Sequence, residues 1–128
     1  MKMIKSYTDL QQSKKLAEIL PIESADMKWY FWKEEIDAPK VPTFGYSKTA
    51  AESYKDTEAV YLPCWSLAAL ISILPAECEC MSLEHINYGN NHKKYFMSYV
   101  GGGNTDIYNN PIDACVAMIE KLHELNLL

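Results

Sequence analysis

Residues 29–32 read Trp-Tyr-Phe-Trp, and this run constrains the fold more than any other stretch of the chain. Aromatic side chains favour the pleated surface of a β-strand, and alternate residues of a strand point to opposite faces. Trp29 and Phe31 therefore share one face, and Tyr30 and Trp32 share the other. Such a strand must be covered on both faces, or it offers one aromatic face to a partner.

Length and composition indicate one compact domain. The chain has 128 residues, close to the usual size of a domain, and 48% of them are hydrophobic, which is enough for a packed core and too much for general disorder. We therefore expect a single domain over residues 1–128. The net charge of −5 argues against unspecific binding to nucleic acid or to an anionic membrane, because both need a basic face.

The apolar segments of the chain predict a cytoplasmic protein. The first residues lack the apolar core of a secretory signal. The longest apolar run, residues 67–74, is interrupted by Ser72 and is far shorter than the roughly 20 residues that span a bilayer. We expect no membrane association, and cysteines that stay reduced.

The first helix is expected to run from Thr8 or Asp9 to Leu20. Either Thr8 or Asp9 can accept a hydrogen bond from the amides of the first turn. Apolar residues recur at helical spacing after this point. Pro21 then ends the helix, because proline cannot continue the hydrogen-bond pattern.

A central helix is expected over residues 67–74. Ser66 can cap its start, and Pro75 ends it. This helix is apolar on nearly every side, whereas an ordinary surface helix keeps a polar face. We expect it to lie at the centre of the core or under another subunit.

The last helix is expected over residues 111–125. Asn110 is a good N-cap, and Pro111 suits the first helical position. One face of the helix is apolar and is expected to cover a sheet. Its members are Ile112, Cys115, Val116, Ile119 and Leu122.

Strand patterns lie between these helices. A short strand is expected over residues 59–62, with Pro63 ending it, and a β-hairpin over residues 82–88 and 93–100, joined by a turn rich in Gly and Asn. Residues 37–56 hold Pro, Gly and scattered polar side chains, so we expect an irregular excursion there. Together the patterns predict an α+β fold, a small antiparallel sheet with helices packed on one face.

Three segments resemble a known group of proteins. They are LPIESADM, YLPCWSLAALISILP and NPIDACVAMIEKLHELNLL. They resemble small uncharacterised proteins encoded on phages and mobile elements of gut anaerobic bacteria, which share a Pro-x-Trp-Ser-Leu start of the central helix, here residues 63–67, and an Asn-Pro entry to the final helix, here residues 110–111. The resemblance implies a phage or mobile-element accessory protein and brings no catalytic residues.

The glycines at residues 101–103 do not form a phosphate loop. A P-loop needs a Lys and a Ser or Thr directly after its last glycine, and a dinucleotide fingerprint needs Gly-x-Gly-x-x-Gly spacing. Here the next cation is Lys121, and the last helix is expected to start about eight residues after Gly103. We interpret the glycines as a bend at the end of a strand.

The cysteines raise the alternative of a metal site or a catalytic nucleophile. Cys78 and Cys80, with His85 or His92 downstream, are ligand types that zinc prefers, but the Cys-x-Cys spacing is not the usual one. Cys64 precedes a helix and could pair with a histidine as a nucleophile. Packing of reduced cysteines in the core is the interpretation we adopt, with no metal and no cofactor. A small Cys- or metal-dependent hydrolase is the alternative.

The leading functional hypothesis rests on the aromatic run. Large aromatic residues are enriched where proteins bind one another. We expect a non-enzymatic interaction protein that binds a protein partner, or itself, through Trp29, Tyr30, Phe31 and Trp32 and the edge of the sheet. The competing interpretation is that all four rings pack in the core. Stacking on single-stranded nucleic acid is a further alternative, disfavoured because few cations flank the run.

Overall fold

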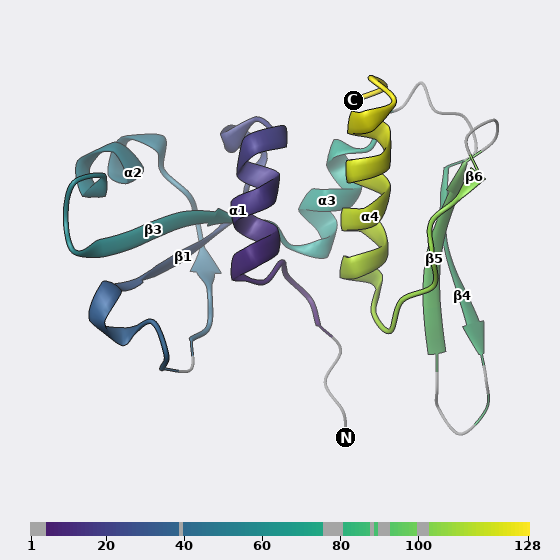
Figure 1. Ribbon diagram of the computed structural model, residues 1–128, viewed down its shortest axis with the longest axis horizontal. Coiled ribbons are helices and arrows are strands. Elements are labelled where there is room, and N and C mark those ends of the chain that lie inside the picture. The colour runs from purple at the N-terminus through teal and green to yellow at the C-terminus, as the bar shows by residue number, and fades with distance from the viewer. Residues whose placement is uncertain (1–4, 39, 76–80, 88, 90–92, 100–102) are drawn as a thin grey trace. The chain divides into compact units, whose positions relative to one another are not determined.

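The protein is described by a computed structural model that places residues 5–38, 40–75, 81–87, 89, 93–99 and 103–128. The chain divides into two compact units (Figure 1). The N-terminal unit is Tyr7–Ala69, and the C-terminal unit is Met1–Ser6 together with Leu70–Leu128. We describe each unit by itself. That the two units form a single domain stays a prediction.

The N-terminal unit is built on a three-stranded antiparallel sheet with strand order β2-β1-β3. Its elements are α1 (Leu10–Ile19), the 3₁₀ turns η1 (Ile22–Ser24) and η2 (Lys33–Glu35), β1 (Met27–Trp32), β2 (Thr43–Phe44), α2 (Lys48–Tyr54), β3 (Ala59–Cys64) and the start of α3 (Leu67–Ile73). The central strand β1 pairs along its whole length with β3. The aromatic run therefore forms a strand, as its composition predicts.

Helix α1 confirms the expected first helix. Asp9 is its N-cap. The Asp9 carboxylate accepts a hydrogen bond from the backbone amide of Gln12 at 2.8 Å, and the Gln12 side-chain oxygen accepts one from the backbone amide of Asp9 at 3.1 Å. This reciprocal capping box satisfies two amides that a helix start leaves without partners. The helix ends at Ile19, with Leu20 as its C-cap before Pro21, and it buries Ser13 and Leu16.

Strand β3 corrects one boundary. Pro63 was expected to end the strand at residue 62, but the strand continues through it to Cys64. The reason is its place in the sheet. β3 is an edge strand, and a proline without an N–H is tolerated where one side of the strand needs no ladder hydrogen bond.

Residues 37–56 are more regular than their composition predicts. They contain β2, which pairs with the start of β1, and the seven-residue helix α2. Ser47 caps α2 by accepting the amide of Ala50 at 3.1 Å. The sequence Ser-Lys-Thr-Ala-Ala-Glu-Ser begins with a good N-cap, a signal that the nearby Gly45 and the polar residues concealed.

The C-terminal unit has a second three-stranded antiparallel sheet, with order β4-β5-β6. Its strands are β4 (Ser82–Asn87), β5 (Lys93–Tyr99) and β6 (Gly103–Asn104). The hairpin of β4 and β5 confirms the expected one, with Leu83 opposite Met97 in the register. The structure thus confirms the α+β class, and the described residues form two antiparallel sheets.

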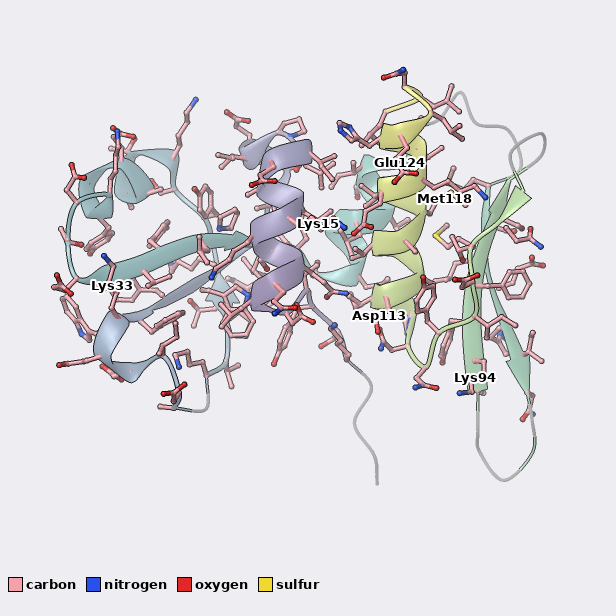
Figure 2. The ribbon with its side chains drawn as sticks, viewed as in Figure 1. Lys15, Lys33, Lys94, Asp113, Met118 and Glu124 are labelled. Atoms are coloured by element: carbon pink, nitrogen blue, oxygen red, sulfur yellow. The ribbon has the colours of Figure 1, made fainter. Side chains whose placement is uncertain are left out.

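Helix α4 (Pro111–Glu124) packs on the second sheet and confirms the expected last helix. Asn110 caps it by accepting the amide of Asp113 at 2.9 Å, and Pro111 occupies the first turn. Every member of the predicted apolar stripe is at most 4% exposed. Figure 2 shows Met118, itself fully buried, directed from α4 toward the sheet.

Helix α3 begins as expected, and Ser66 caps it by accepting the amide of Ala69 at 3.2 Å. It is not buried on all sides. Leu70 has no exposed surface, whereas Ile71 is 47% exposed. The expectation that the whole helix lies inside the core is therefore wrong for one of its faces, and cover by another subunit stays a prediction.

Candidate functional site

The aromatic run of β1 is divided between two environments. Trp29 and Phe31 are 6% and 7% exposed, and they form a core with Met27 and Cys64. Tyr30 and Trp32, which alternate with them, are 43% and 46% exposed. Core packing is therefore confirmed for Trp29 and Phe31, and the expectation that these two rings bind a partner is wrong because they are buried. For Tyr30 and Trp32, which point to the opposite face of the strand, partner binding stays a prediction.

The exposed half of the run belongs to a larger cluster of rings. We call this cluster the aromatic face; its members are Tyr30, Trp32, Tyr46, Tyr54 and Tyr61. Tyr30 is central, with ring centroids 5.1 Å from Tyr54, 6.0 Å from Tyr61 and 6.4 Å from Trp32. Tyr54 and Tyr61 stack at 5.6 Å with planes 24° apart. These spacings fall in the range of favourable ring pairs.

Three elements bring these rings together. The register of β1 and β3 sets Tyr30 directly opposite Tyr61, so both side chains point to the same face. Helix α2 contributes Tyr54 from its last position. Tyr46 lies just before α2, 5.3 Å from Tyr61, and the amide of Ser47 donates to the Tyr61 hydroxyl at 3.0 Å. The face is therefore anchored by backbone pairing and by a helix start.

Two phenols of the aromatic face, Tyr30 and Tyr46, have raised pKa values, which favours their neutral form. A hydrogen bond with Tyr54 raises the pKa of Tyr30 above its usual value, and desolvation adds to the effect. Burial raises the pKa of Tyr46, with smaller contributions from Tyr61 and Glu23. Neutral phenols combine a broad apolar ring with a hydroxyl that donates and accepts, which suits contact with a surface of mixed polarity.

A buried polar network supports the opposite face of β1. The indole Nε1 of Trp29 donates to Ser13 Oγ at 3.2 Å, and the hydroxyls of Ser13 and Thr8 lie 2.8 Å apart. The amide of Trp65 donates to Thr8 Oγ1 at 3.1 Å. Thr8 and Ser13 have no exposed surface, so these bonds satisfy groups that water cannot reach. The network ties β1 to α1 and to the end of β3.

Cys64, the candidate nucleophile, lies in this network and not in a cleft. It is fully buried, with Thr8 Oγ1 3.5 Å and the Thr8 carbonyl oxygen 3.4 Å from its sulfur. Burial raises the pKa of the Cys64 thiol, which disfavours the thiolate needed for attack. Burial also raises the pKa of Cys115 to about 12. Both thiols are packed as the sequence analysis expected.

The metal candidates are not assembled by the part of the chain that the structure describes. Cys78, Cys80 and His92 lie outside the described residues. His85 is exposed on β4, its ring 6.4 Å from that of Tyr95. Within the described ranges, no group of three or more His, Cys, Asp and Glu side chains is placed to hold a metal ion.

The glycine segment bends at Gly103, whose φ of +85° lies in the left-handed region that favours glycine. Gly103 pairs back with Tyr99, and residues 101–102 lie outside the described ranges. Lys121, which the spacing placed far from the glycines, does approach Gly103: its Nζ donates to the carbonyl oxygen of the next residue, Asn104, at 3.1 Å. The surrounding pocket is acidic and unsuited to phosphate; its carboxylates are Asp106, Glu120 and Glu124.

Two of the five rings of the aromatic face, Tyr30 and Trp32, were predicted from the sequence. The other three, Tyr46, Tyr54 and Tyr61, were not, and two of them lie in the stretch expected to be irregular. A signal was present, because nine tyrosines are many for this length and three of them fall within sixteen residues. Only the strand register and the fold of α2 show that these three meet Tyr30.

Comparisons of the chain with family models, with curated proteins and with solved structures found no match. Among the described residues, no helix combines the length and the apolar character needed to cross a membrane.

Proposed function

We propose that this chain is a non-enzymatic protein-interaction module, an accessory protein of a phage or mobile element, which binds a partner protein through the aromatic face. The observation that carries the proposal is the cluster of five contacting rings around the half-exposed Tyr30 and Trp32. The phage or mobile-element origin is supported by the resemblance of the three segments quoted above.

The chemistry of the face favours a protein surface as its occupant. Tyr and Trp bring large contact areas at a small cost in conformational entropy, and they dominate binding hot spots. The rings are also held by ring contacts and by the hydrogen bond between Ser47 and Tyr61 before any partner arrives. A rigid aromatic surface loses little entropy on binding.

Nucleic acid fits the face less well. A groove for single strands combines stacking rings with cations that follow the phosphates. Among alternate residues of β1, Lys28 shares the face with Tyr30 and Trp32. On the α2 side, Lys48 is within 3.6 Å of Glu23, and Lys55 is within 3.6 Å of Glu52. The rim is thus of mixed charge and does not form a basic track.

Site-specific photo-crosslinking tests the proposal. A benzoylphenylalanine is introduced at Trp32 in cells that carry the gene, and adducts are identified by mass spectrometry. Phe44 is the matched control position, since it is an exposed aromatic residue of the same unit that pairs with Met27 and so points to the other face of the sheet. We expect a defined adduct with another protein from position 32 that is absent from position 44 and is lost when Tyr30 is changed to Ser.

The remaining outcomes contradict the proposal in distinct ways. An adduct of the chain with a second copy of itself assigns the face to self-association. An adduct with nucleic acid supports the single-strand alternative. The same adducts from both positions, or none from position 32, remove the face as a binding site.

A further inference from the structure

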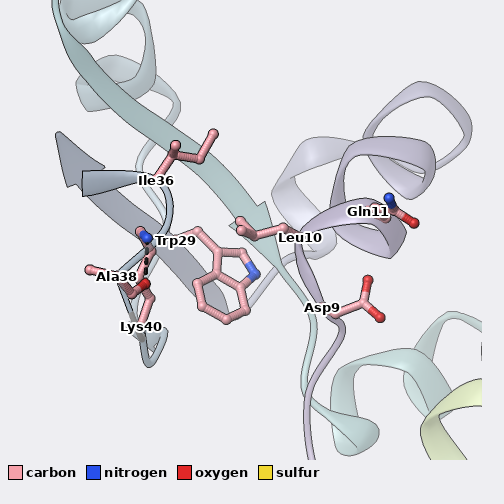
Figure 3. A pocket seen from close by; sticks show the side chains of 7 residues that line it. All are labelled: Asp9, Leu10, Gln11, Trp29, Ile36, Ala38 and Lys40. Carbon is pink, nitrogen blue, oxygen red and sulfur yellow. Dashed lines mark hydrogen bonds between the residues drawn. The ribbon is translucent and has the colours of Figure 1, made fainter. Parts of the chain in front are cut away.

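A hollow opens on the face of β1 opposite the aromatic face, over the core of the N-terminal unit. It has a volume of about 350 Å³, within the range of small-ligand sites. Apolar side chains form most of its wall: Leu10 from the start of α1, Ile36 and Ala38 from the loop after η2, and the edge of Trp29. Figure 3 shows the indole of Trp29 between α1 and this loop.

The two charged groups of the pocket, Asp9 and Lys40, are of opposite sign and lie on opposite sides of the indole (Figure 3). Asp9 and Gln11 stand on the α1 side, and Lys40 stands on the loop side. The ammonium of Lys40 lies 4.6 Å from the centroid of the Phe31 ring and donates to the carbonyl oxygen of Ala38 at 2.6 Å. These contacts hold the ammonium beside the apolar wall.

Lys40 has a charge that the rest of the described chain does not neutralise. None of the ion pairs found among the described residues includes it. A carbonyl oxygen and a ring face attract an ammonium but leave its full charge in place, so it can still bind an anion strongly. Asp9, on the α1 side, repels an anion and favours its placement toward Lys40.

We propose that this pocket binds a small aromatic carboxylate. The ring packs against the edge of Trp29 between Leu10 and Ile36, and the carboxylate pairs with the ammonium of Lys40. The pocket accommodates a single ring with a short acid side chain, and the ring contact supplies the apolar part of the binding free energy. This site lies on the face of β1 opposite Tyr30 and Trp32, and the inference does not depend on the proposed protein-binding function.

The test is an NMR titration of the full-length protein with phenylacetate. Its matched probe is phenethylamine, which keeps the ring and the chain length and reverses the charge. The indole N–H of Trp29 reports on the pocket, and the indole N–H of Trp65, bonded to Ser24 at 2.9 Å, is an internal reference. We expect a saturable shift of the Trp29 signal with phenylacetate, no matching shift of the Trp65 signal, and affinity for phenethylamine weaker by about tenfold or more.

Two variants make the test specific. Lys40→Gln should weaken phenylacetate binding by about tenfold. Lys33→Gln, which removes an exposed lysine of η2 outside the pocket lining, should leave it unchanged. An unshifted Trp29 indole signal in the ligand-free Lys40→Gln protein shows that the pocket is intact. Equal binding of the two probes, equal binding by Lys40→Gln and wild type, or no saturable shift overturns the inference.

Discussion

Strand β1 and helix α4 use their large side chains in opposite ways. In α4 the apolar residues of the predicted stripe recur at helical spacing and are all buried. In β1 bulky residues occupy both parities, and the strand buries Trp29 and Phe31 while Tyr30 and Trp32 stay nearly half exposed. The helix completes a core, whereas the strand completes a core with one face and presents rings with the other.

The difference follows from the two periodicities. A helix has 3.6 residues per turn, so side chains three and four positions apart lie on one face, and the residues on the other faces can be polar. A strand alternates, so consecutive aromatic residues cannot share a side. Four rings in succession therefore place two rings on a second face, and the rings of Tyr46, Tyr54 and Tyr61 gather there.

The sharpest test of this comparison replaces the two tryptophans of β1. Trp29→Ala removes a buried ring and a hydrogen bond to Ser13, so we expect a loss of about 4 kcal/mol in the free energy of unfolding. Trp32→Ala removes a half-exposed ring, and we expect about 1 kcal/mol or less. Urea denaturation measures both. Losses of similar size would contradict the division of the strand into a core face and an open face.

The contrast between a buried and an exposed side chain can also be tested in the C-terminal unit. Ile119 has no exposed surface, so Ile119→Ala should lower the free energy of unfolding by about 3 kcal/mol. Ile107, which is 50% exposed, is the matched position, and Ile107→Ala should cost about 0.5 kcal/mol. Thermal and urea unfolding report the difference. A small effect at Ile119 would mean that the stripe of α4 does not carry the core of this unit.

The polar network behind β1 should contribute a smaller amount. Ser13→Ala leaves the Trp29 indole N–H and the Thr8 hydroxyl without their buried partner, and we expect a loss of about 2 kcal/mol. The control is Ser53→Ala, because the Ser53 hydroxyl is exposed and donates within its own helix; we expect about 0.5 kcal/mol or less. If urea denaturation gave equal losses in the free energy of unfolding for the two variants, the network would not contribute to stability.

The smallest expected effect concerns the phenols of the aromatic face. The hydrogen bond with Tyr54 raises the pKa of Tyr30, so Tyr54→Phe should return it toward the usual value of 10.0. Because the folded protein favours the neutral phenol, the associated stability is present below pH 10 and is lost as the pH rises through the raised pKa. NMR titration of the tyrosine ring carbons measures the shift. An unchanged Tyr30 titration in Tyr54→Phe would contradict the contact.

Local signals predicted much of the fold. The starts of two helices are marked by Asp9, Asn110 and Pro111. Their capping and backbone preferences act within a few residues, so they can be recognised in the sequence. The β4–β5 hairpin was equally clear. The effect of Pro63 was misjudged because it depends on position in the sheet, and an edge strand accepts a proline that a central strand rejects. Helix α2 was missed because the N-cap signal of Ser47 lies among Gly45 and polar residues.

The candidate sites were predicted only in part, since each joins side chains that are distant along the chain. The Tyr30–Tyr61 pair requires the register of β1 and β3, and the contact of Lys40 with the Phe31 ring, beside a pocket that Leu10 also lines, requires the path of the loop after η2. Nothing in the spacing of these residues indicates such contacts. The number of tyrosines was the single hint, and it did not say where they would meet.

By itself the sequence determined that β1 is an aromatic strand with bulky residues at both parities, and that α4 has one apolar stripe with defined caps. Those properties arise from the backbone preferences and the spacing of neighbouring residues. The tertiary structure decided which parity of β1 is buried, since α1 and the Thr8–Ser13 network cover the side of Trp29. Burial is a property of what packs against a residue, and here the covering groups come from segments far away in the chain.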